Sequence, residues 1–311
     1  MKRKLSKLNL SNKYNTQFSI YFRQNANLTE FTNSESWVVL SPIEKQIKEK
    51  IERIGTPLKD WDIRINYGIK TGFNEAFIID GAKRKELIDE DPKSEEIIRP
   101  ILRGRDIKRY GYDFADLWLI NTHNGVKEKG IKCINTEDYP AIKKHLDQYY
   151  PQLEKRADKG DTPYNLRNCA YMEDFSKQKI MYPNMTKFLP FYLDDKGFMQ
   201  NDKSFMITGK HVAFLTAFLN SSIFKYCFID NFPELQGGTR ELRKIFLDKI
   251  PILEITDKTN KEFEKLVLKL QDLIVKQKQT KEIELEIDNK IFDLYSLNQE
   301  ERNIIGFIEI Q

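Results

Sequence analysis

The sequence predicts an α+β fold, in which a mixed β-sheet with packed helices is followed by a C-terminal helical segment. Apolar and polar residues alternate from Ile63 to Lys70, which is the period of a half-buried strand. From Phe263 to Ile274, apolar residues recur at the spacing of one helix face. We therefore expect three parts: an N-terminal arm with a connecting helix over residues 1–58, a sheet domain over residues 59–256, and a helical segment over residues 257–311.

The composition is that of a folded protein with a well-solvated surface, because 40% of the 311 residues are apolar, 12% aromatic and 32% charged. The 51 basic and 47 acidic residues leave a net charge of +4, which only weakly suggests a polyanionic partner. The cysteines and histidines show no metal-ligand spacing, so we expect no metal site and reduced thiols in a cytoplasmic protein. The apolar stretch from Val212 to Ile229 is broken by polar residues and predicts a buried helix, with no membrane partner.

The N-terminal part divides at Ser41. Residues 1–40 show no sustained period and predict an irregular arm. Ser41 and Glu44 have the spacing of a capping box with Pro42 at the first helical position, and an apolar stripe continues to Ile54. The sequence therefore predicts a helix that begins at Pro42.

A β-hairpin is predicted next. Residues 63–69 fit its first strand, residues 71–74 its turn and residues 76–79 its returning strand. Lys70, Thr71 and Asn74 would then lie at the tip of a rigid hairpin, where loops often carry recognition. A simple solvated tip is the other interpretation.

A cluster of basic residues follows the hairpin. Residues 99–110 contain five basic residues and one acid, and Gly104 lies between Arg103 and Arg105. Guanidinium groups beside a glycine can bind phosphates or a guanine edge with two hydrogen bonds. They can equally pair with buried carboxylates or carbonyls of the protein itself.

The middle of the chain alternates short elements with polar loops. Residues 117–120 predict a buried strand that leads into a polar loop containing Asn124, and Pro140 opens a helix. The polar segment 155–167 ends at Arg167 and is a plausible loop for reading a groove.

The second half begins with predicted strands at residues 179–183, 188–193 and 204–207, and Lys187 lies between the first two. An apolar helix is expected over residues 210–230. It is followed by a glycine loop with Gly238, Thr239 and Arg240, whose backbone amides could approach a phosphate. Further helices are expected after Phe263, after Ile283 and after the Asn298 cap.

Asp194 and Lys196 have a D-x-K spacing of the kind found in nuclease sites. No Pro-Asp dipeptide precedes them, and acidic turns before a glycine are common. A self-contained magnesium-dependent nuclease is therefore kept as an alternative.

Several segments, taken in order, resemble the TaqI-like C-terminal specificity domain of type IIG restriction-modification enzymes and related adenine-specific DNA methyltransferases. The resemblance covers roughly residues 60–300 and rests on residues 67–77, 101–107, 118–120, 179–180, 217–222, 237–238 and 249–251. It implies that residues 59–256 are a DNA target-recognition domain that binds double-stranded DNA. The enzymes of this family carry an NPPY-like tetrapeptide and a glycine loop for S-adenosylmethionine, whereas this sequence has no Pro-Pro and no G-x-G.

The resemblance thus implies a recognition fragment without catalytic, cofactor-binding or metal-binding residues. A methyltransferase domain or subunit, in cis or in trans, would bind S-adenosylmethionine and flip the base. The second alternative is an interaction subunit, in which the Phe263–Ile274 stripe docks a methylase chain. The residues expected to bind DNA are Lys70, Thr71, Asn74, Arg103, Arg105, Asn124, Arg167, Lys187, Gly238, Thr239 and Arg240.

Overall fold

The structure is a computed structural model that describes residues 41–187 and 189–308. The chain divides into two compact units, residues 1–50 and residues 51–311. The predicted irregular arm over residues 1–40 lies outside the described residues. The predicted boundaries near residues 58 and 256 stay predictions.

Helix α2 (Pro42–Ile54) begins where the capping box predicted. The Ser41 amide donates to the Glu44 carboxylate at 2.6 Å, and the Glu44 amide donates to the Ser41 hydroxyl at 3.3 Å. This reciprocal pair satisfies two amides that the first helical turn leaves without intrahelical partners.

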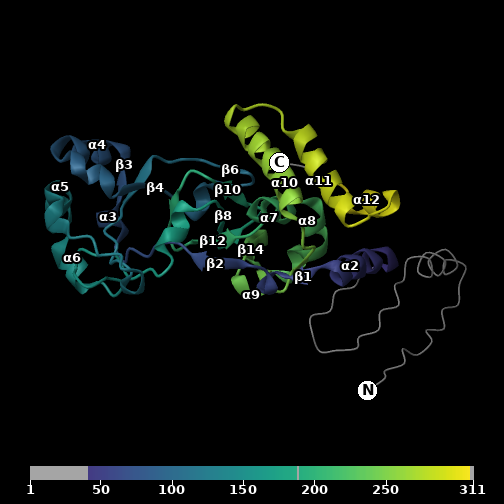
Figure 1. The fold of residues 1–311 in the computed structure, drawn as a ribbon, viewed down its shortest axis with the longest axis horizontal. Helices are drawn as coiled ribbons and strands as arrows, with labels where there is room; N and C mark the ends of the chain where they lie inside the picture. The colour runs from purple at the N-terminus through teal and green to yellow at the C-terminus, as the bar shows by residue number, and fades with distance from the viewer. Residues whose placement is uncertain (1–40, 188, 309–311) are drawn as a thin grey trace, which may run out of the picture. The chain divides into compact units, whose positions relative to one another are not determined.

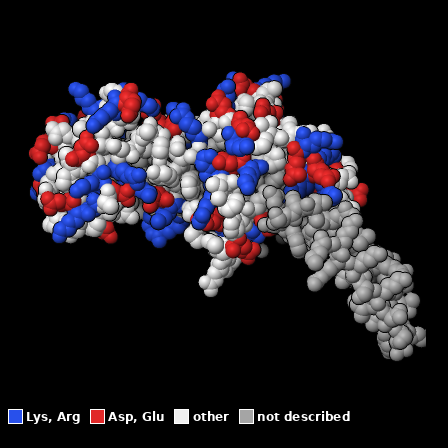
Figure 2. Space-filling view, turned by 90° about the horizontal axis from the view of Figure 1, so that it is seen from below, with Lys and Arg blue, Asp and Glu red and all other residues white. Residues whose placement is uncertain are grey.

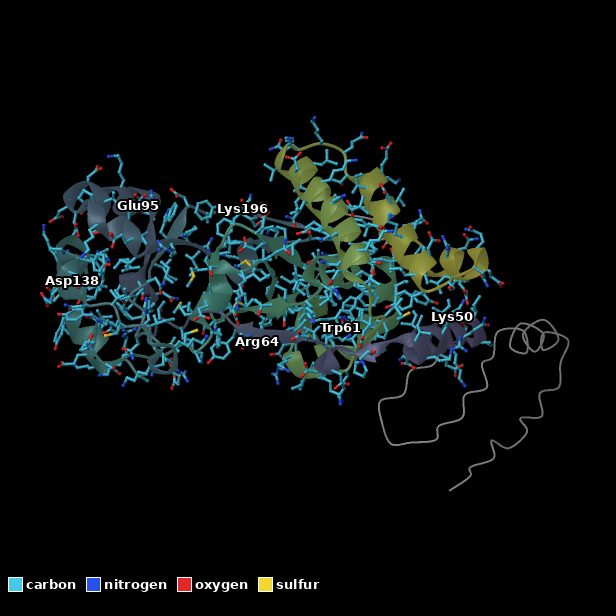
Figure 3. The ribbon with its side chains drawn as sticks, viewed as in Figure 1. Lys50, Trp61, Arg64, Glu95, Asp138 and Lys196 are labelled. Carbon is cyan, nitrogen blue, oxygen red and sulfur yellow. The ribbon has the colours of Figure 1, made fainter. Side chains whose placement is uncertain are left out.

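An antiparallel sheet with the strand order β10, β8, β12, β2 carries most of the predicted strands (Figure 1). Figure 3 shows Lys196, which follows β10, and Arg64, in β2, at opposite edges of this sheet. Helix α7 (Val212–Leu219) packs against three of its strands. The bounds are β2 (Ile63–Tyr67), β8 (Lys179–Pro183), β10 (Tyr192–Asp194) and β12 (Ser204–Gly209).

The predicted hairpin over residues 63–79 is wrong. Strand β2 pairs with β12, and residues 74–77 form a short helix, α3 (Asn74–Phe77). Strand β3 (Ile78–Asp80) pairs with β7 in another sheet. The alternation correctly predicts a half-buried strand but does not specify its partner, and the buried side chains of Ala76 and Phe77 draw the following residues into a different core cluster.

The second four-stranded sheet has the order β11, β4, β7, β3 and belongs to that other cluster. Its strands are β3, β4 (Ile98–Leu102), β7 (Leu117–Ile120) and β11 (Met199–Gln200). Helices α4 (Gly81–Glu90), α5 (Pro140–Asp147) and α6 (Tyr150–Lys155) accompany it (Figure 1). The predicted strand over residues 117–120 and the predicted helix at Pro140 are confirmed.

The remaining strands are short and form three small antiparallel sheets. They are β1 (Thr56–Pro57) with β15 (Pro251–Ile252), β5 (Ile107–Lys108) with β6 (Gly111–Tyr112), and β9 (Met185–Thr186) with β13 (Glu234–Leu235) and β14 (Thr239–Glu241).

His145 fastens α5 to α3, because its Nε2 lies 3.0 Å from the Ala76 carbonyl. Burial lowers the pKa of His145, and the hydrogen bond to Ala76 opposes this shift only in part. The folded protein therefore favours neutral His145.

We expect the free energy of unfolding to fall as the pH drops from about 6.5 through the lower pKa of folded His145, because the unfolded chain binds the proton first. Urea unfolding of wild type and His145→Gln between about pH 8 and about pH 5 should show a shallower pH dependence in the variant. Burial also lowers the pKa of His123, so His123→Gln is the matched control. This variant should keep the part of the pH dependence that comes from His145. An identical pH dependence in wild type and His145→Gln would contradict the assignment.

The predicted single helix over residues 210–230 is two helices, α7 and α8 (Ser222–Phe228). Ser221 separates them by capping α8, since its hydroxyl accepts a hydrogen bond from the Phe224 amide at 3.2 Å. Among the described residues no single helix is long and apolar enough to cross a membrane. The bent pair α7 and Ser222–Asn231 passes that test of length and composition together, with 65° between its halves.

The predicted C-terminal helices are confirmed as α10 (Asp257–Val275), α11 (Lys281–Leu294) and α12 (Gln299–Ile305), with a capping box between Asn298 and Glu301. The stripe that begins at Phe263 packs against α7, where the rings of Phe263 and Phe214 lie edge to face with their centres 5.1 Å apart. The Gln271 side chain accepts from the Leu193 amide at 3.2 Å and donates to the Leu193 carbonyl at 3.1 Å. Helix α10 is thus bound to β10 at the sheet edge.

Candidate nucleic-acid interface

The predicted DNA-binding residues come from segments that the fold links by direct contacts. Gly104, between Arg103 and Arg105, packs so closely that a Cβ there would lie 2.9 Å from the Lys203 carbonyl oxygen and 3.3 Å from the Pro183 side chain. Only glycine fits this approach without displacing the neighbouring backbone. The short helix at residues 104–106 therefore packs closely against the end of β8 and the residue before β12.

The segments around Lys187 and Arg240 join the same region. The Asn184 amide donates to the Lys203 carbonyl at 2.9 Å, and the Leu242 amide donates to the Asn184 carbonyl at 2.8 Å. Strand β14, which contains Thr239 and Arg240, pairs with β9 just before Lys187.

The loop with Lys70 and Thr71 continues the series in the other direction. The Gly68 amide donates to the Ser204 carbonyl at 3.0 Å, and the Ile69 amide donates to the Gln200 carbonyl at 2.7 Å. Buried Arg156 donates to the Thr71 carbonyl, which ties this loop to residues 156–168.

Arg167 and Asn124 complete the series at the polar loop. Arg167 donates to Asp158 at 2.9 Å, and the Asn124 side chain accepts from the Asp161 amide at 2.8 Å. An unbroken run of contacts therefore connects Asn124 at one end with Arg240 at the other.

Four of the predicted side chains are used inside the protein. Arg103 makes two hydrogen bonds to the Asp106 carboxylate, each of 2.8 Å. Arg240 contacts the Phe232 carbonyl at 2.8 Å, Asp230 at 2.8 Å and Glu234 at 3.1 Å. Arg167 pairs with Asp158, and Asn124 is buried with its amide bonded to Asp161. Arg103 therefore pairs with a buried carboxylate of the protein itself, which is the second of the two interpretations that its sequence context allowed.

The pair formed by Arg103 and Asp106 is electrostatically tight. Burial by itself would raise the pKa of Asp106, but the hydrogen bonds from the Arg103 side chain and backbone outweigh burial, so the pKa lies below its usual range. The same hydrogen bond raises the pKa of Arg103. Both groups stay charged near neutral pH and hold the backbone that presents Arg105.

The remaining predicted residues differ in their availability. Arg105 and Lys187 are exposed, and no ion pair joins either side chain to another described residue. The Lys70 ammonium lies 5.6 Å from the ring centre of exposed Tyr67. Thr71 is buried and donates to the exposed Asn74 side chain at 2.6 Å. Gly238 lies in the glycine loop with a φ of +75°, and Thr239 begins strand β14.

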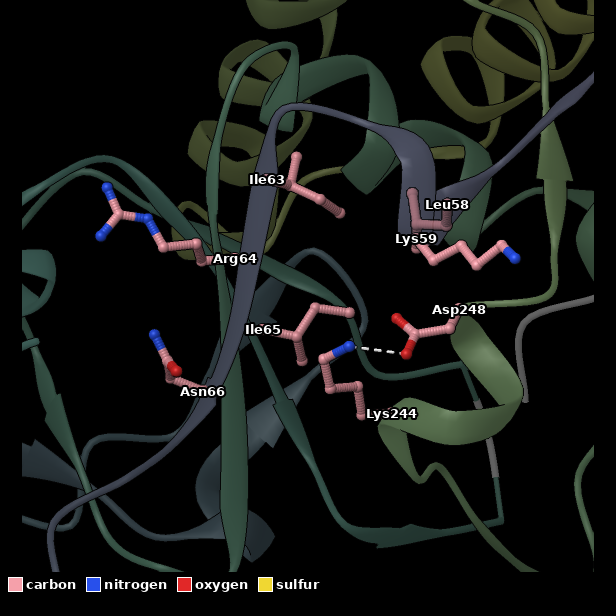
Figure 4. Close-up of a pocket in the computed structure, with 8 residues that line it drawn as sticks. All are labelled: Leu58, Lys59, Ile63, Arg64, Ile65, Asn66, Lys244 and Asp248. Carbon is pink, nitrogen blue, oxygen red and sulfur yellow. Dashed lines mark hydrogen bonds and ion pairs between the residues drawn. The ribbon is translucent and has the colours of Figure 1, made fainter.

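A cavity of about 270 Å³ lies beside β2 and was not predicted. Figure 4 shows that Ile63 and Ile65 point to one side of β2 and Arg64 and Asn66 to the other, as strand alternation requires. The cavity is lined by Leu58, Lys59, Ile63, Arg64, Ile65, Asn66, Lys244 and Asp248. The Arg64 side chain is 68% exposed and lies 4.0 Å from Asp174. Arg64 lies on the polar side of the alternating strand, and this alternation is the sequence signal that could have identified Arg64 as a surface residue beside the cavity.

Basic and acidic side chains are mixed on the face of the molecule that Figure 2 shows. Figure 2 views the molecule from below, the side on which β14 and helix α9 (Lys244–Leu247) lie in Figure 1. Lys and Arg alternate there with Asp and Glu, and an uncharged projection extends from the surface. On the face drawn in Figure 2, basic and acidic side chains are therefore interspersed.

Asp194, the residue of the nuclease alternative, is fully buried. Its carboxylate binds the Lys179 ammonium and accepts the amides of Phe198 at 3.0 Å and Lys196 at 3.1 Å. Across residues 41–187 and 189–308, no group of three or more His, Cys, Asp or Glu side chains could hold a metal ion. The geometry gives the nuclease interpretation no exposed carboxylate at this position.

Comparison with known proteins finds a family match and two similar solved structures. Residues 99–252 match the family of the TaqI-like C-terminal specificity domain. The chain is similar to the type IIL restriction-modification enzyme MmeI, solved in complex with DNA, with 11% identity, a TM-score of 0.57, and coverage of 78% of this chain and 34% of that one. It is also similar to the type IIG restriction endonuclease BpuSI, with 16% identity, a TM-score of 0.48, and coverage of 82% and 34%.

The family match contains most of the segments on which the resemblance rests, including Arg103 to Arg105 and the step Ile250-Pro251. The likeness to MmeI agrees with the predicted α+β fold. The chain spans about a third of the length of the two solved proteins. Residues 99–252 are thus identified as a TaqI-like C-terminal specificity domain.

Proposed function

We propose that this chain is the DNA target-recognition part of a restriction-modification enzyme or adenine-specific DNA methyltransferase. The family match over residues 99–252 carries the proposal. The contact series from Asn124 to Arg240 supports it, because direct contacts link loops that are distant in sequence.

In this proposal exposed cations bind phosphates and uncharged loop residues face the bases. Arg105, Lys187 and Lys70 are the cations of choice, since their side chains are exposed or only half-buried. Arg103, Arg167 and Arg240 act indirectly by holding the loops that carry contacting groups.

Catalysis belongs to another part of the enzyme in this proposal. A methyltransferase domain or subunit, in cis or in trans, would bind S-adenosylmethionine and flip the target adenine. The interaction-subunit alternative is not favoured for the stripe from Phe263, since Phe263, Val267 and Leu270 are buried within the chain.

Replacing Arg105 by alanine is expected to weaken binding of duplex DNA by about 1–3 kcal/mol if the guanidinium makes a bidentate contact. Arg105 is exposed, so the fold should be unaffected. Fluorescence anisotropy with labelled duplex at low salt measures the change.

The control is Lys269→Ala, which also removes one exposed cation but lies on α10, away from the contact series. It should bind DNA like wild type. Equal affinities of Arg105→Ala and Lys269→Ala would remove Arg105 from the interface, and no binding of any duplex by wild type would count against the proposed function itself.

A further inference from the structure

The small sheet of β13, β14 and β9 has two chemically different faces. Its register pairs Leu235 with Thr239 and Met185 with Glu241, whereas Glu234, Arg240 and Thr186 form the other row. Because successive side chains of a strand alternate between faces, Leu235, Thr239 and Met185 share one face and Arg240 lies on the opposite one.

The face with Leu235 and Met185 is apolar and open. Leu235 is 39% exposed and Met185 is 54% exposed, two of the large apolar side chains that the described chain leaves in solvent. Glu241 is the one acid in this row, and it is neutralised by Arg243 at 2.8 Å. That hydrogen bond lowers the pKa of Glu241, so the pair stays ionised near neutral pH.

The loop that joins β13 to β14 is narrow and uncharged. It contains Gln236, Gly237 and Gly238, and the glycines have φ values of +76° and +75°, with no neighbouring atom within 4 Å of the position that a Cβ would occupy. A left-handed backbone at two successive positions favours glycine and makes a tight tip in which Gln236 carries the one side chain. Residues 235–239 are consecutive and carry no charge.

The opposite face explains how such a projecting ribbon keeps its shape. Arg240 bridges its cross-strand partner Glu234 at 3.1 Å, Asp230 at 2.8 Å and the Phe232 carbonyl at 2.8 Å. These bonds clamp the base of the ribbon from behind. Arg240 therefore supports the ribbon and does not lie on its apolar face.

We infer that the ribbon of β13 and β14 enters the major groove and that Leu235 reads a thymine through its methyl group. This rests on the proposed function. The major groove admits a two-stranded β-ribbon, and the thymine C5-methyl is the apolar group that it displays.

The charge pattern around the ribbon favours DNA as the occupant. Lys187 is exposed directly after β9, Lys203 accepts a hydrogen bond from the Asn184 amide, and Arg105 follows Gly104, which packs against Lys203. Duplex DNA presents phosphates on both sides of a groove and uncharged base edges between them. An uncharged tip over residues 235–239 beside exposed cations matches that arrangement, with Glu234 and Glu241 paired to Arg240 and Arg243.

The test uses the full chain. A preferred duplex is first selected from a randomised library, and each thymine in it is then replaced by uracil, which removes only the methyl group. One replacement should weaken wild-type binding about fourfold, the effect of one buried methyl group. In Leu235→Ala the same replacement should leave affinity nearly unchanged.

Ile245→Ala is the matched control, since Ile245 is another exposed apolar residue, 57% exposed on α9, and lies outside the ribbon. It should keep the difference between thymine and uracil. Equal thermal unfolding of wild type and variants checks folding.

The failures are distinguishable. A library without an enriched sequence would overturn the proposed function and this inference together. A selected duplex that tolerates uracil everywhere, or a thymine preference that persists in Leu235→Ala, would overturn the role of Leu235 and leave target recognition standing.

Discussion

Replacing Lys179 by methionine is expected to lower the free energy of unfolding by about 3–5 kcal/mol. Lys179 and Asp194 are fully buried and face each other across β8 and β10. The Lys179 ammonium also donates to the Phe175 carbonyl at 2.6 Å. Methionine fills the space but leaves the Asp194 carboxylate buried without a countercharge. Urea unfolding followed by circular dichroism measures the loss.

Two further variants separate the lost charge from the lost packing. Lys179→Met combined with Asp194→Leu should regain much of the stability, because replacing both partners of a buried pair removes the uncompensated charge. Lys196→Met, which alters an exposed lysine bonded to Tyr112, should cost little. A loss in Lys179→Met no larger than that in Lys196→Met would show that the buried pair does not govern stability.

Replacing Arg109 by alanine is expected to lower the free energy of unfolding by about 2–4 kcal/mol. Its guanidinium donates to the Asn220 carbonyl at 2.9 and 3.3 Å and pairs with Glu284 on α11. Alanine leaves a largely buried carboxylate and a carbonyl without these donors. Arg109→Lys should be intermediate, since an ammonium keeps the charge but not the forked geometry.

Arg109 and Arg105 should therefore behave in opposite ways. Arg109→Ala should lower the midpoint of urea unfolding, while the folded protein binds duplex DNA with unchanged affinity. Arg105→Ala should show the reverse. Weakened DNA binding by fully folded Arg109→Ala would instead place Arg109 at the interface.

Elements with local signals were predictable from the sequence. The capping boxes at Ser41 and Asn298 and the stripe from Phe263 each lie within a few helical turns, so neighbouring residues determine them. The hairpin failed because pairing is not local. The partner of β2 is β12, far along the chain, and the alternation from Ile63 to Lys70 fits any strand that covers one face.

The arginine cluster shows a second limit. Composition reveals a positive segment at residues 99–110 but not where each guanidinium points. Arg103 is turned to Asp106 nearby, whereas Arg109 reaches Asn220 and Glu284 on distant segments. Only Asp106, three residues from Arg103, could have been suspected as a partner from spacing.

The ribbon face was beyond sequence reasoning for a related reason. Leu235 and Met185 lie on one face only because β13, β14 and β9 pair in a particular register. Gly237 and Gly238 mark the loop in the sequence, and the charge of Arg240 beside them suggests DNA contact there, whereas in the fold Arg240 is bonded to Asp230. Register, not charge, determines which residues of this loop face outward.

The side-chain amide of Gln271 makes the two hydrogen bonds to Leu193 that the backbone of a neighbouring strand would otherwise make. Strand β10 ends its sheet, and an unpaired sheet edge invites aggregation between molecules. By offering Leu193 both a donor and an acceptor, Gln271 occupies that edge with a side chain. The family match ends at residue 252, before Gln271. A chimera that contains this domain only up to residue 252 would leave the edge of β10 without the hydrogen bonds from Gln271. A chimera made to exchange specificity should therefore also contain α10.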